Sequence, residues 1–313
     1  MQNILNWLKT TPYKEYTLSI ASADASFRKY YRLTSKEKTL LLMDSSLEQA
    51  SLKPFIDVTQ RLAQVGVKVP KILSSYLDKG YLIIEDFGNT HYLDVLDTHN
   101  FKKLYKDAID EIVKMQNATT RNLPLYDKEF LHFEMDIMQE YYIVKHLNKE
   151  LTPTQQDILD AMLHIISNEV LQQPQNLFVH RDFHSRNIML TPQGEIGIID
   201  YQDAMSGALC YDLVSLLKDC YIEFDTQDIQ ELALYFKQEK KVEVDDATFL
   251  KWFDFMGLQR HIKVLGIFAR LYYRDGKDGY LKDIPLTLHY TLQAAKRYKE
   301  LTPLVELLEE LHH

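Results

Sequence analysis

From Phe178 to Tyr201 the chain reads FVHRDFHSRNIMLTPQGEIGIIDY, and this stretch decides the fold. Its apolar start predicts the end of a strand, and polar residues occupy 180–187. Two apolar runs around a Pro-Gln-Gly turn predict a hairpin over 188–199, and Asp200 follows it directly. One acid would therefore begin a polar loop and a second would follow a hairpin, which is how a fold brings two acids to one site.

The spacing of Asp182, Asn187 and Asp200 predicts phosphoryl transfer. An Asp-x4-Asn segment followed by a hairpin and another Asp is typical of the catalytic loop and metal loop of kinases. Mg²⁺ prefers oxygen ligands, which Asn187 and Asp200 supply. Asp182 would orient the attacking hydroxyl and accept its proton late, so an ordinary carboxyl pKa suffices. We therefore predict Asp182 as the base, with ATP and Mg²⁺ as cofactors.

Two other interpretations of this loop stay open. His180, Asp182 and His184 alternate along an extended segment and could together ligate zinc. Zinc would leave Asn187 and the hairpin that ends at Asp200 unexplained. The loop could also be a polar surface segment beside an incidental acid.

The predicted secondary structure changes near residue 88, from mainly strands to mainly helices. Before it, apolar patterns predict strands over 18–26, 27–33, 39–43 and 81–84 and a helix over 55–65. After it, apolar spacings of three and four predict helices over 101–112, 130–144, 152–170, 246–273 and 301–313. The third of these begins with the capping-box pattern Thr-Pro-Thr-Gln. We therefore place an N-lobe at 1–87 and a C-lobe at 88–313.

Composition excludes several classes of protein. The chain of 313 residues has a formal net charge of −9, which argues against nucleic-acid binding. It has no apolar run long enough for a membrane span and no signal-peptide pattern at its start. Cys210 and Cys220 fit neither a disulfide framework nor a zinc site. We expect a monomeric cytoplasmic protein with reduced thiols and no nucleic-acid or membrane partner.

The string His180-Arg181-Asp182 with Asn187 and Asp200 resembles the aminoglycoside phosphotransferase and choline kinase superfamily. Segments 23–28, 92–96, 201–204 and 259–270 resemble the subfamily of bacterial anomeric kinases for N-acetylmuramate and N-acetylglucosamine. The resemblance covers nearly the whole chain. It implies an α+β, two-lobed protein-kinase-like fold, with an antiparallel sheet and a helix in the N-lobe and a mainly helical C-lobe. It also implies an ATP-dependent sugar 1-kinase that acts on a small-molecule amino sugar in cell-wall recycling.

The resemblance further implies a nucleotide site in the N-lobe. Ala25 and Ser26 fall where a Gly-rich loop would cover phosphates, although a plain β-turn also fits. The backbone of Glu85, Asp86 and Phe87 would hold the adenine edge.

The family's strand lysine, which holds the α- and β-phosphates, is missing from the strand over 39–43. Arg28 or Arg32 on the adjacent strand could replace it, because a guanidinium grips phosphate with two N–H donors. Solvated strand residues are the alternative, and without a cation the chain could be a nucleotide-binding pseudokinase.

Candidate substrate-binding residues lie in three places. Two lie in the predicted catalytic loop, two follow Asp200, and three lie on the predicted helix over 246–273. A cation on that helix would suit the lactyl carboxylate of a muramic sugar. The candidates are His184 and Arg186, Gln202 and Asp203, and Arg260, His261 and Arg270. Scaffold or salt-bridge roles are the alternative, and for Asp212 at a helix start we expect a brace that bonds the loop backbone.

A different small-molecule kinase, of the aminoglycoside, choline or homoserine type, is the main rival. A cationic substrate would call for an acidic patch in the C-lobe, which four acids in the predicted helix over 130–144 and just before it could form. They are Glu129, Glu134, Asp136 and Glu140.

Overall fold

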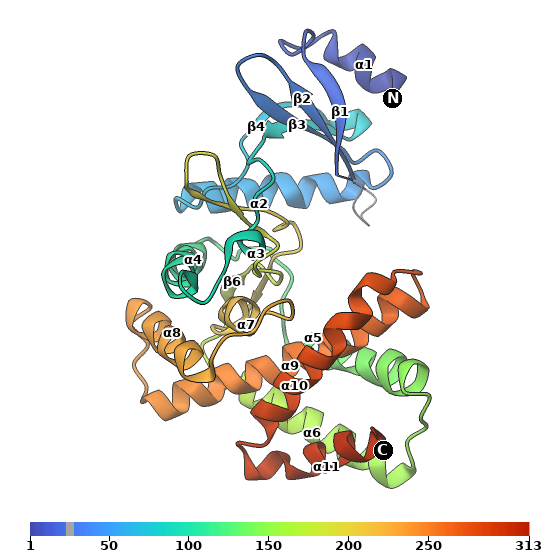
Figure 1. Ribbon diagram of the computed structural model, residues 1–313, viewed down its shortest axis with the longest axis vertical. Helices are drawn as coiled ribbons and strands as arrows, with labels where there is room; N and C mark the ends of the chain where they lie inside the picture. Colours follow the sequence, from blue (N-terminus) through green and yellow to red (C-terminus); the bar gives the residue numbers. More distant parts are fainter. Residues whose placement is uncertain (23–27, 313) are drawn as a thin grey trace. The chain divides into compact units, whose positions relative to one another are not determined.

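The computed structural model describes residues 1–22 and 28–312 (Figure 1). The chain forms two compact units, each built from two separate segments. The first unit comprises Met1–Val95 and Arg186–Asp203, and the second comprises Leu96–Ser185 and Ala204–His313. The first unit thus extends beyond residue 87 and includes the hairpin that the sequence places between the two acids.

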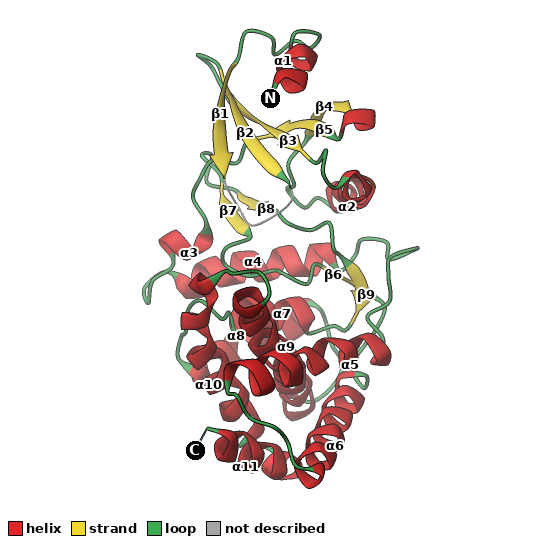
Figure 2. Cartoon of the chain, turned by 90° about the vertical axis from the view of Figure 1, so that its right-hand side faces the viewer, coloured by secondary structure: helices red, strands yellow, loops and turns green. Residues whose placement is uncertain are grey.

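A five-stranded antiparallel sheet forms the first unit, in the order β1-β2-β3-β5-β4 (Figure 2). Its strands are β1 (Thr17–Ser22), β2 (Lys29–Thr34), β3 (Thr39–Asp44), β4 (Ile72–Tyr76) and β5 (Tyr81–Glu85). Because side chains alternate along a strand, Leu40 and Leu42 of β3 share one face, where they pack in one cluster with Trp7. That tryptophan belongs to helix α1 (Gln2–Leu8), while α2 (Leu52–Gln64) lies on the other side of the sheet (Figures 1 and 2).

The predicted hairpin is formed by β7 (Ile188–Leu190) and β8 (Ile196–Ile198). Backbone N–H groups attach it to the first unit: Ile198 donates to the carbonyl of Lys68 at 2.9 Å, and Leu190 donates to that of Thr90 at 2.9 Å. Gly197 lies so close to Phe87 that an added Cβ would be 2.4 Å from the ring. The hairpin is therefore packed against the segment that follows β5. Helix α3 (Tyr92–Val95) and two 3-10 turns, η1 (Gln49–Ser51) and η2 (Leu77–Lys79), complete the unit.

Helix α9 (Asp246–Tyr273) forms the core of the second unit, and its residues 252–266 are all buried. It packs against α5 (Lys128–Ile137), α6 (Pro153–Val170), α7 (Tyr211–Leu217), α8 (Thr226–Glu239) and α10 (Ile284–Ala295). The unit also contains α4 (Phe101–Met115), α11 (Thr302–Leu311), 3-10 turns η4 (Asp278–Asp283) and η5 (Lys299–Leu301), and the strand pair β6 (Leu177–Val179) and β9 (Met205–Gly207). Among the described residues, no helix combines the length and apolar composition that a bilayer span requires.

The helix pattern confirms most predictions and corrects one. The capping box of α6 is present, with Thr152 N–H bonded to the Gln155 side chain at 2.9 Å and the Gln155 N–H bonded to the Thr152 hydroxyl at 3.3 Å. The single helix predicted over 130–144 is wrong, because α5 ends at Ile137 and the π-helix η3 (Met138–His146) follows. Helices α8 and α10 were not predicted.

We predict that Gly266→Ala destabilises the second unit. Gly266 of α9 faces the junction of α5 and η3, where an added Cβ would lie 2.4 Å from the carbonyl carbon of Ile137 and from the nitrogen of Met138. Backbone cannot yield as a flexible side chain can, so we expect the unfolding free energy to fall by about 1–3 kcal/mol, measured by denaturant titration. Gly279→Ala is the control, since nothing lies within 4 Å of its Cβ position. Equal effects of both substitutions would contradict this packing argument.

Candidate active site

The loop over 180–187, which is predicted to be catalytic, begins in a strained backbone conformation. Arg181 has a φ of 79°, in the left-handed region that non-glycine residues rarely adopt. The carboxylate of Asp212 accepts the N–H of His180 at 2.8 Å and the N–H of Arg181 at 3.0 Å. Burial raises the pKa of Asp212 to about 6, so the group is ionised at neutral pH. The predicted brace at the start of α7 is therefore confirmed, and it fixes the loop just before Asp182.

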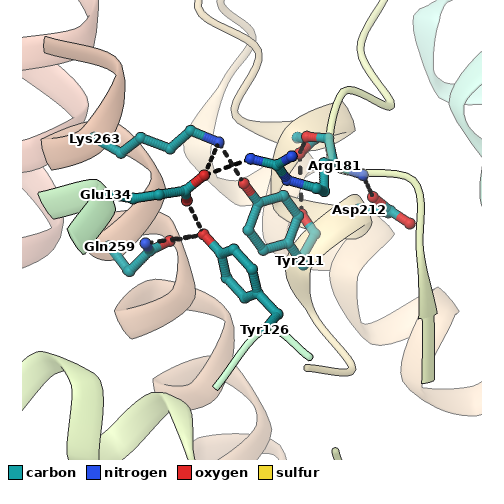
Figure 3. A network of polar contacts seen from close by, with 8 residues as sticks. Tyr126, Glu134, Arg181, Tyr211, Asp212, Gln259 and Lys263 are labelled. Atoms are coloured by element: carbon teal, nitrogen blue, oxygen red, sulfur yellow. Dashed lines mark hydrogen bonds and ion pairs between the residues drawn. The ribbon is translucent and has the colours of Figure 1, made fainter. Parts of the chain in front are cut away.

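A buried network holds the side chain of Arg181 (Figure 3). Its guanidinium pairs with the Glu134 carboxylate of α5 at 2.5 Å, and the Lys263 ammonium of α9 lies 3.1 Å from the same carboxylate. Lys263 also donates to the Tyr211 hydroxyl at 2.9 Å. On the other side the Tyr126 hydroxyl donates to Glu134. Glu134 thus links the loop to α9 as well as to α5.

Asp182 is half-buried in this cationic surrounding. Burial alone would raise its pKa, but the positive charges of Lys263, Arg260 and Arg181 outweigh burial and lower the pKa to about 2. The expected ordinary value near 4 is therefore too high. The carboxyl is ionised throughout the physiological range, as a proton acceptor must be, and its low basicity suits a proton taken late in the reaction.

A second buried acid fixes the end of the loop. Asp219 accepts the backbone N–H of Ser185 at 2.9 Å and its hydroxyl at 2.5 Å through one carboxylate oxygen. Its other oxygen accepts the N–H of Tyr221 at 3.1 Å. No spacing in the sequence pointed to Asp219. The His184 ring packs edge to face against Tyr221, and its Nδ1 finds no hydrogen-bond partner among the described residues.

In the first unit, the structure brings Asn187 and Asp200 together. The Asn187 amide nitrogen lies 3.4 Å from one carboxylate oxygen of Asp200, and the Gln202 amide donates to the other at 3.0 Å. Asp200 also has a left-handed backbone, with a φ of 63°. The buried Tyr201 follows it and anchors this turn, because its ring stacks on Phe55 with centroids 5.3 Å apart.

These residues fit a hard divalent cation. Asp200 supplies exposed carboxylate oxygens, the Asn187 side chain carries an amide oxygen, and Gln202 bonds the neighbouring Asp203 at 3.2 Å. No cluster of three or more His, Cys, Asp or Glu side chains suited to a metal occurs within the described part of the chain. A site with few protein ligands is typical of Mg²⁺, which keeps water and phosphate oxygens as its other ligands. The convergence of this pair with Asp182, which belongs to the other unit, stays a prediction.

The predicted nucleotide residues occupy different settings within the first unit. Arg32 is bound to the Asp86 carboxylate at 2.7 and 3.2 Å, and it also donates to the Gly88 carbonyl. Arg28 is buried and donates to the Ser51 hydroxyl at 3.3 Å. In the segment predicted to hold adenine, the N–H of Glu85 bonds the Lys71 carbonyl at 2.9 Å, and Phe87 is buried against Gly197. Ala25 and Ser26 lie outside the described residues.

The predicted substrate residues on α9 also differ from one another. Arg260 is buried and reaches the Cys220 sulfur at 3.6 Å. His261 is fully buried, where its ring bonds the Lys218 carbonyl at 3.0 Å and burial lowers its pKa to about 3. Arg270 is half-buried, and its Nε finds no hydrogen-bond partner among the described residues. Arg186, on the hairpin side of the loop, is half-buried, and its carbonyl bonds the His91 ring at 2.6 Å.

Similarity in sequence to known proteins shows which family of enzymes the chain belongs to. The profile of the phosphotransferase enzyme family matches residues 17–245. A curated protein of Neisseria meningitidis serogroup B, named N-acetylmuramate/N-acetylglucosamine kinase, is 40% identical across 98% of this chain and 94% of its own length. A protein of the same name from Pseudomonas aeruginosa is 37% identical across 93% of this chain and 87% of its own length.

Solved structures resemble the chain in fold. An ADP-bound aminoglycoside phosphotransferase matches with a TM-score of 0.64 and 14% identity, over 93% of this chain and 98% of that one. A choline kinase from Streptococcus pneumoniae matches with a TM-score of 0.65 and 12% identity, over the same shares. The chain belongs to the phosphotransferase enzyme family. The predicted α+β fold of the protein-kinase type and the predicted phosphotransferase class are confirmed.

We predict that Asp219→Asn lowers stability by about 1–3 kcal/mol, because donors face both carboxylate oxygens and an amide offers only one acceptor. One buried N–H would then point at the new NH₂ group. Asp127→Asn at the start of α5 is the matched control, since Asp127 caps its helix through a single N–H and asparagine caps equally well. Denaturant titration of both variants measures the difference. A loss for Asp219→Asn no larger than that for Asp127→Asn would show that the second oxygen is dispensable.

Proposed function

We propose that the chain is an ATP-dependent kinase that phosphorylates the anomeric hydroxyl of N-acetylmuramate or N-acetylglucosamine. The observation that carries the proposal is the ionised Asp182, which lies among buried cations directly after the residue that Asp212 braces. The names of the relatives from Neisseria meningitidis and Pseudomonas aeruginosa support the substrate class. The product would be a sugar 1-phosphate for cell-wall recycling, made in the cytoplasm by a monomeric enzyme.

Asp182 would accept the hydrogen bond of the sugar hydroxyl and take its proton as the phosphoryl group arrives. An anomeric hydroxyl is more acidic than the other hydroxyls of a sugar, so a weak base suffices. The low pKa of Asp182 keeps it in the accepting form at every physiological pH.

Asn187 and Asp200 would hold Mg²⁺ through an amide oxygen and a carboxylate. When bound, Mg²⁺ would neutralise negative charge on the nucleotide phosphates. We favour Arg28 over Arg32 as the cation that replaces the missing strand lysine. Burial raises the pKa of the hydroxyl of Tyr201, the residue after Asp200, and the positive charge of Arg28 lies close enough to oppose that effect in part. Arg32 is bound to Asp86 instead.

Sugar binding would use polar side chains of the loop, of the segment after Asp200 and of α9. Gln202 and Asp203 could bind sugar hydroxyls, and the neutral ring of His184 has a buried nitrogen for the same purpose. For a lactyl carboxylate, Arg270 is the best cation on α9. Lys263 is occupied by Glu134, whereas Arg270 lies two helical turns further along nearly the same face.

The rival kinase for a cationic substrate has weaker support. Of the acids that would form its patch, Glu134 is buried, and Arg181 and Lys263 neutralise it. The pseudokinase alternative would have to explain why Asp182, Asn187 and Asp200 are all retained.

We predict that the purified chain with ATP and Mg²⁺ converts N-acetylmuramate to its 1-phosphate. Phosphorus NMR of the product identifies the modified oxygen directly. Asp182→Asn is the control variant, and it should reduce turnover by orders of magnitude while nucleotide binding changes little. Phosphorylation of choline or an aminoglycoside in preference to either sugar would overturn the proposal, as would unchanged turnover in Asp182→Asn.

We predict that Arg270→Gln raises the KM for N-acetylmuramate by roughly tenfold or more, because a charge-assisted hydrogen bond to the carboxylate is lost. The KM for N-acetylglucosamine, which lacks that carboxylate, should change by less than about threefold. Arg274→Gln near the end of the same helix serves as control, since that side chain is exposed and pairs with Asp275. Steady-state kinetics with both sugars decides the matter. Equal losses for the two sugars would rule out Arg270 as the carboxylate contact.

A further inference from the structure

Lys263 occupies an unusual position for a lysine. Its side chain is only 7% exposed, in the stretch of α9 that is buried on all sides. Burial alone would lower the pKa of its ammonium group, but the Tyr211 hydroxyl and the Glu134 carboxylate raise it above the ordinary value. The group is therefore a permanent positive charge inside the second unit.

The buried cations around Lys263 outnumber the single carboxylate that contacts them. Glu134 supplies one negative charge, yet it contacts two cations, Arg181 at 2.5 Å and Lys263 at 3.1 Å. Arg260 is a third buried cation nearby. Its charge, like that of Lys263, lowers the pKa of Asp182. The carboxylate of Asp182 offsets part of this positive excess. The network and the ionised Asp182 thus stabilise each other.

Stability alone does not account for such a cluster. Burying ions costs solvation, and well-packed apolar side chains of similar volume often serve a fold as well or better. Here the buried charges come from α5, α9 and the loop itself, and Tyr211 of α7 joins them (Figure 3). These groups converge on Arg181, the loop residue with the left-handed backbone.

We propose that Lys263 is a positioning residue for phosphoryl transfer. Its ammonium, held by Glu134 and Tyr211, fixes Arg181 through the shared Glu134 carboxylate, and with Arg181 it fixes the backbone that aims Asp182. This inference rests on the proposed role of Asp182 as the base. It assigns to the reaction a side chain of α9 that lies outside the loop.

The test uses the full chain with Lys263→Met, which keeps most of the volume and removes the charge. We expect kcat to fall roughly a hundredfold, because the base is misplaced, while the KM for ATP changes by less than about threefold. Lys263→Arg keeps the charge and should restore part of kcat. Turnover of the parent enzyme on N-acetylglucosamine tests the proposed function separately, since it depends on no variant.

The pH profile distinguishes this role from a merely structural one. Asp182 faces the cations Arg181, Arg260 and Lys263, the His184 ring and the Asp212 carboxylate. Removing the Lys263 charge raises the pKa of Asp182 from about 2 toward its ordinary value. More of the base is then protonated at a given low pH, so the acidic limb of kcat/KM moves to higher pH in Lys263→Met but not in Lys263→Arg.

A second buried ion pair on α9 supplies the control. Asp254 pairs with Lys218 at 2.7 Å and with Arg297 at 2.9 Å. Asp254→Asn should reduce stability while kcat and the pH profile stay as in the parent. If Lys263→Met fails to fold, the double variant Glu134→Gln/Lys263→Met removes one charge of each sign and still lacks the ammonium, so we expect low kcat again. A kcat within about threefold of the parent in either Lys263→Met or the double variant would overturn the proposal.

Discussion

The carboxylate of Glu134 is the contact on which the catalytic loop depends most. It is buried, and it binds a cation from the loop and a cation from α9, with the Tyr126 hydroxyl on its other side. These partners lower the pKa of Glu134 despite burial, which by itself would raise it. A buried charge that loses its partner destabilises the fold strongly. The Glu134 carboxylate therefore ties α5, α9 and the loop to one another.

Strained backbone occurs directly before Asp182 and at Asp200. Arg181 and Asp200 have positive φ values although neither is glycine, and such residues persist only where their surroundings hold them. Asp212 holds the first through two N–H groups, and the buried ring of Tyr201 anchors the second. Each strained residue is thus stabilised by a neighbour that takes no direct part in the proposed chemistry.

Local patterns were enough to predict the hairpin, four of the five strands of the sheet, the capping box of α6 and the bounds of α9, because each depends on neighbouring residues. The spacing of Ile229, Leu232, Ala233 and Phe236 by three and four also indicates α8. Helix α10 gave a weaker signal, since its buried face includes threonines such as Thr287 and Thr291. The network around Glu134 could not be predicted, because its members are far apart in the sequence and no spacing relates them.

The attachment of the hairpin to the segment after β5 has a consequence for how a nucleotide would bind. Gly197 packs against Phe87, and Ile198 bonds Lys68, so Asn187 and Asp200 belong to the same compact body as the segment over 85–87, which is predicted to hold adenine. The adenine end and the phosphate end of ATP would both be gripped by this one body. The donor could then load completely before any acceptor sugar arrives, and thermal motion elsewhere in the chain would not pull its two ends apart.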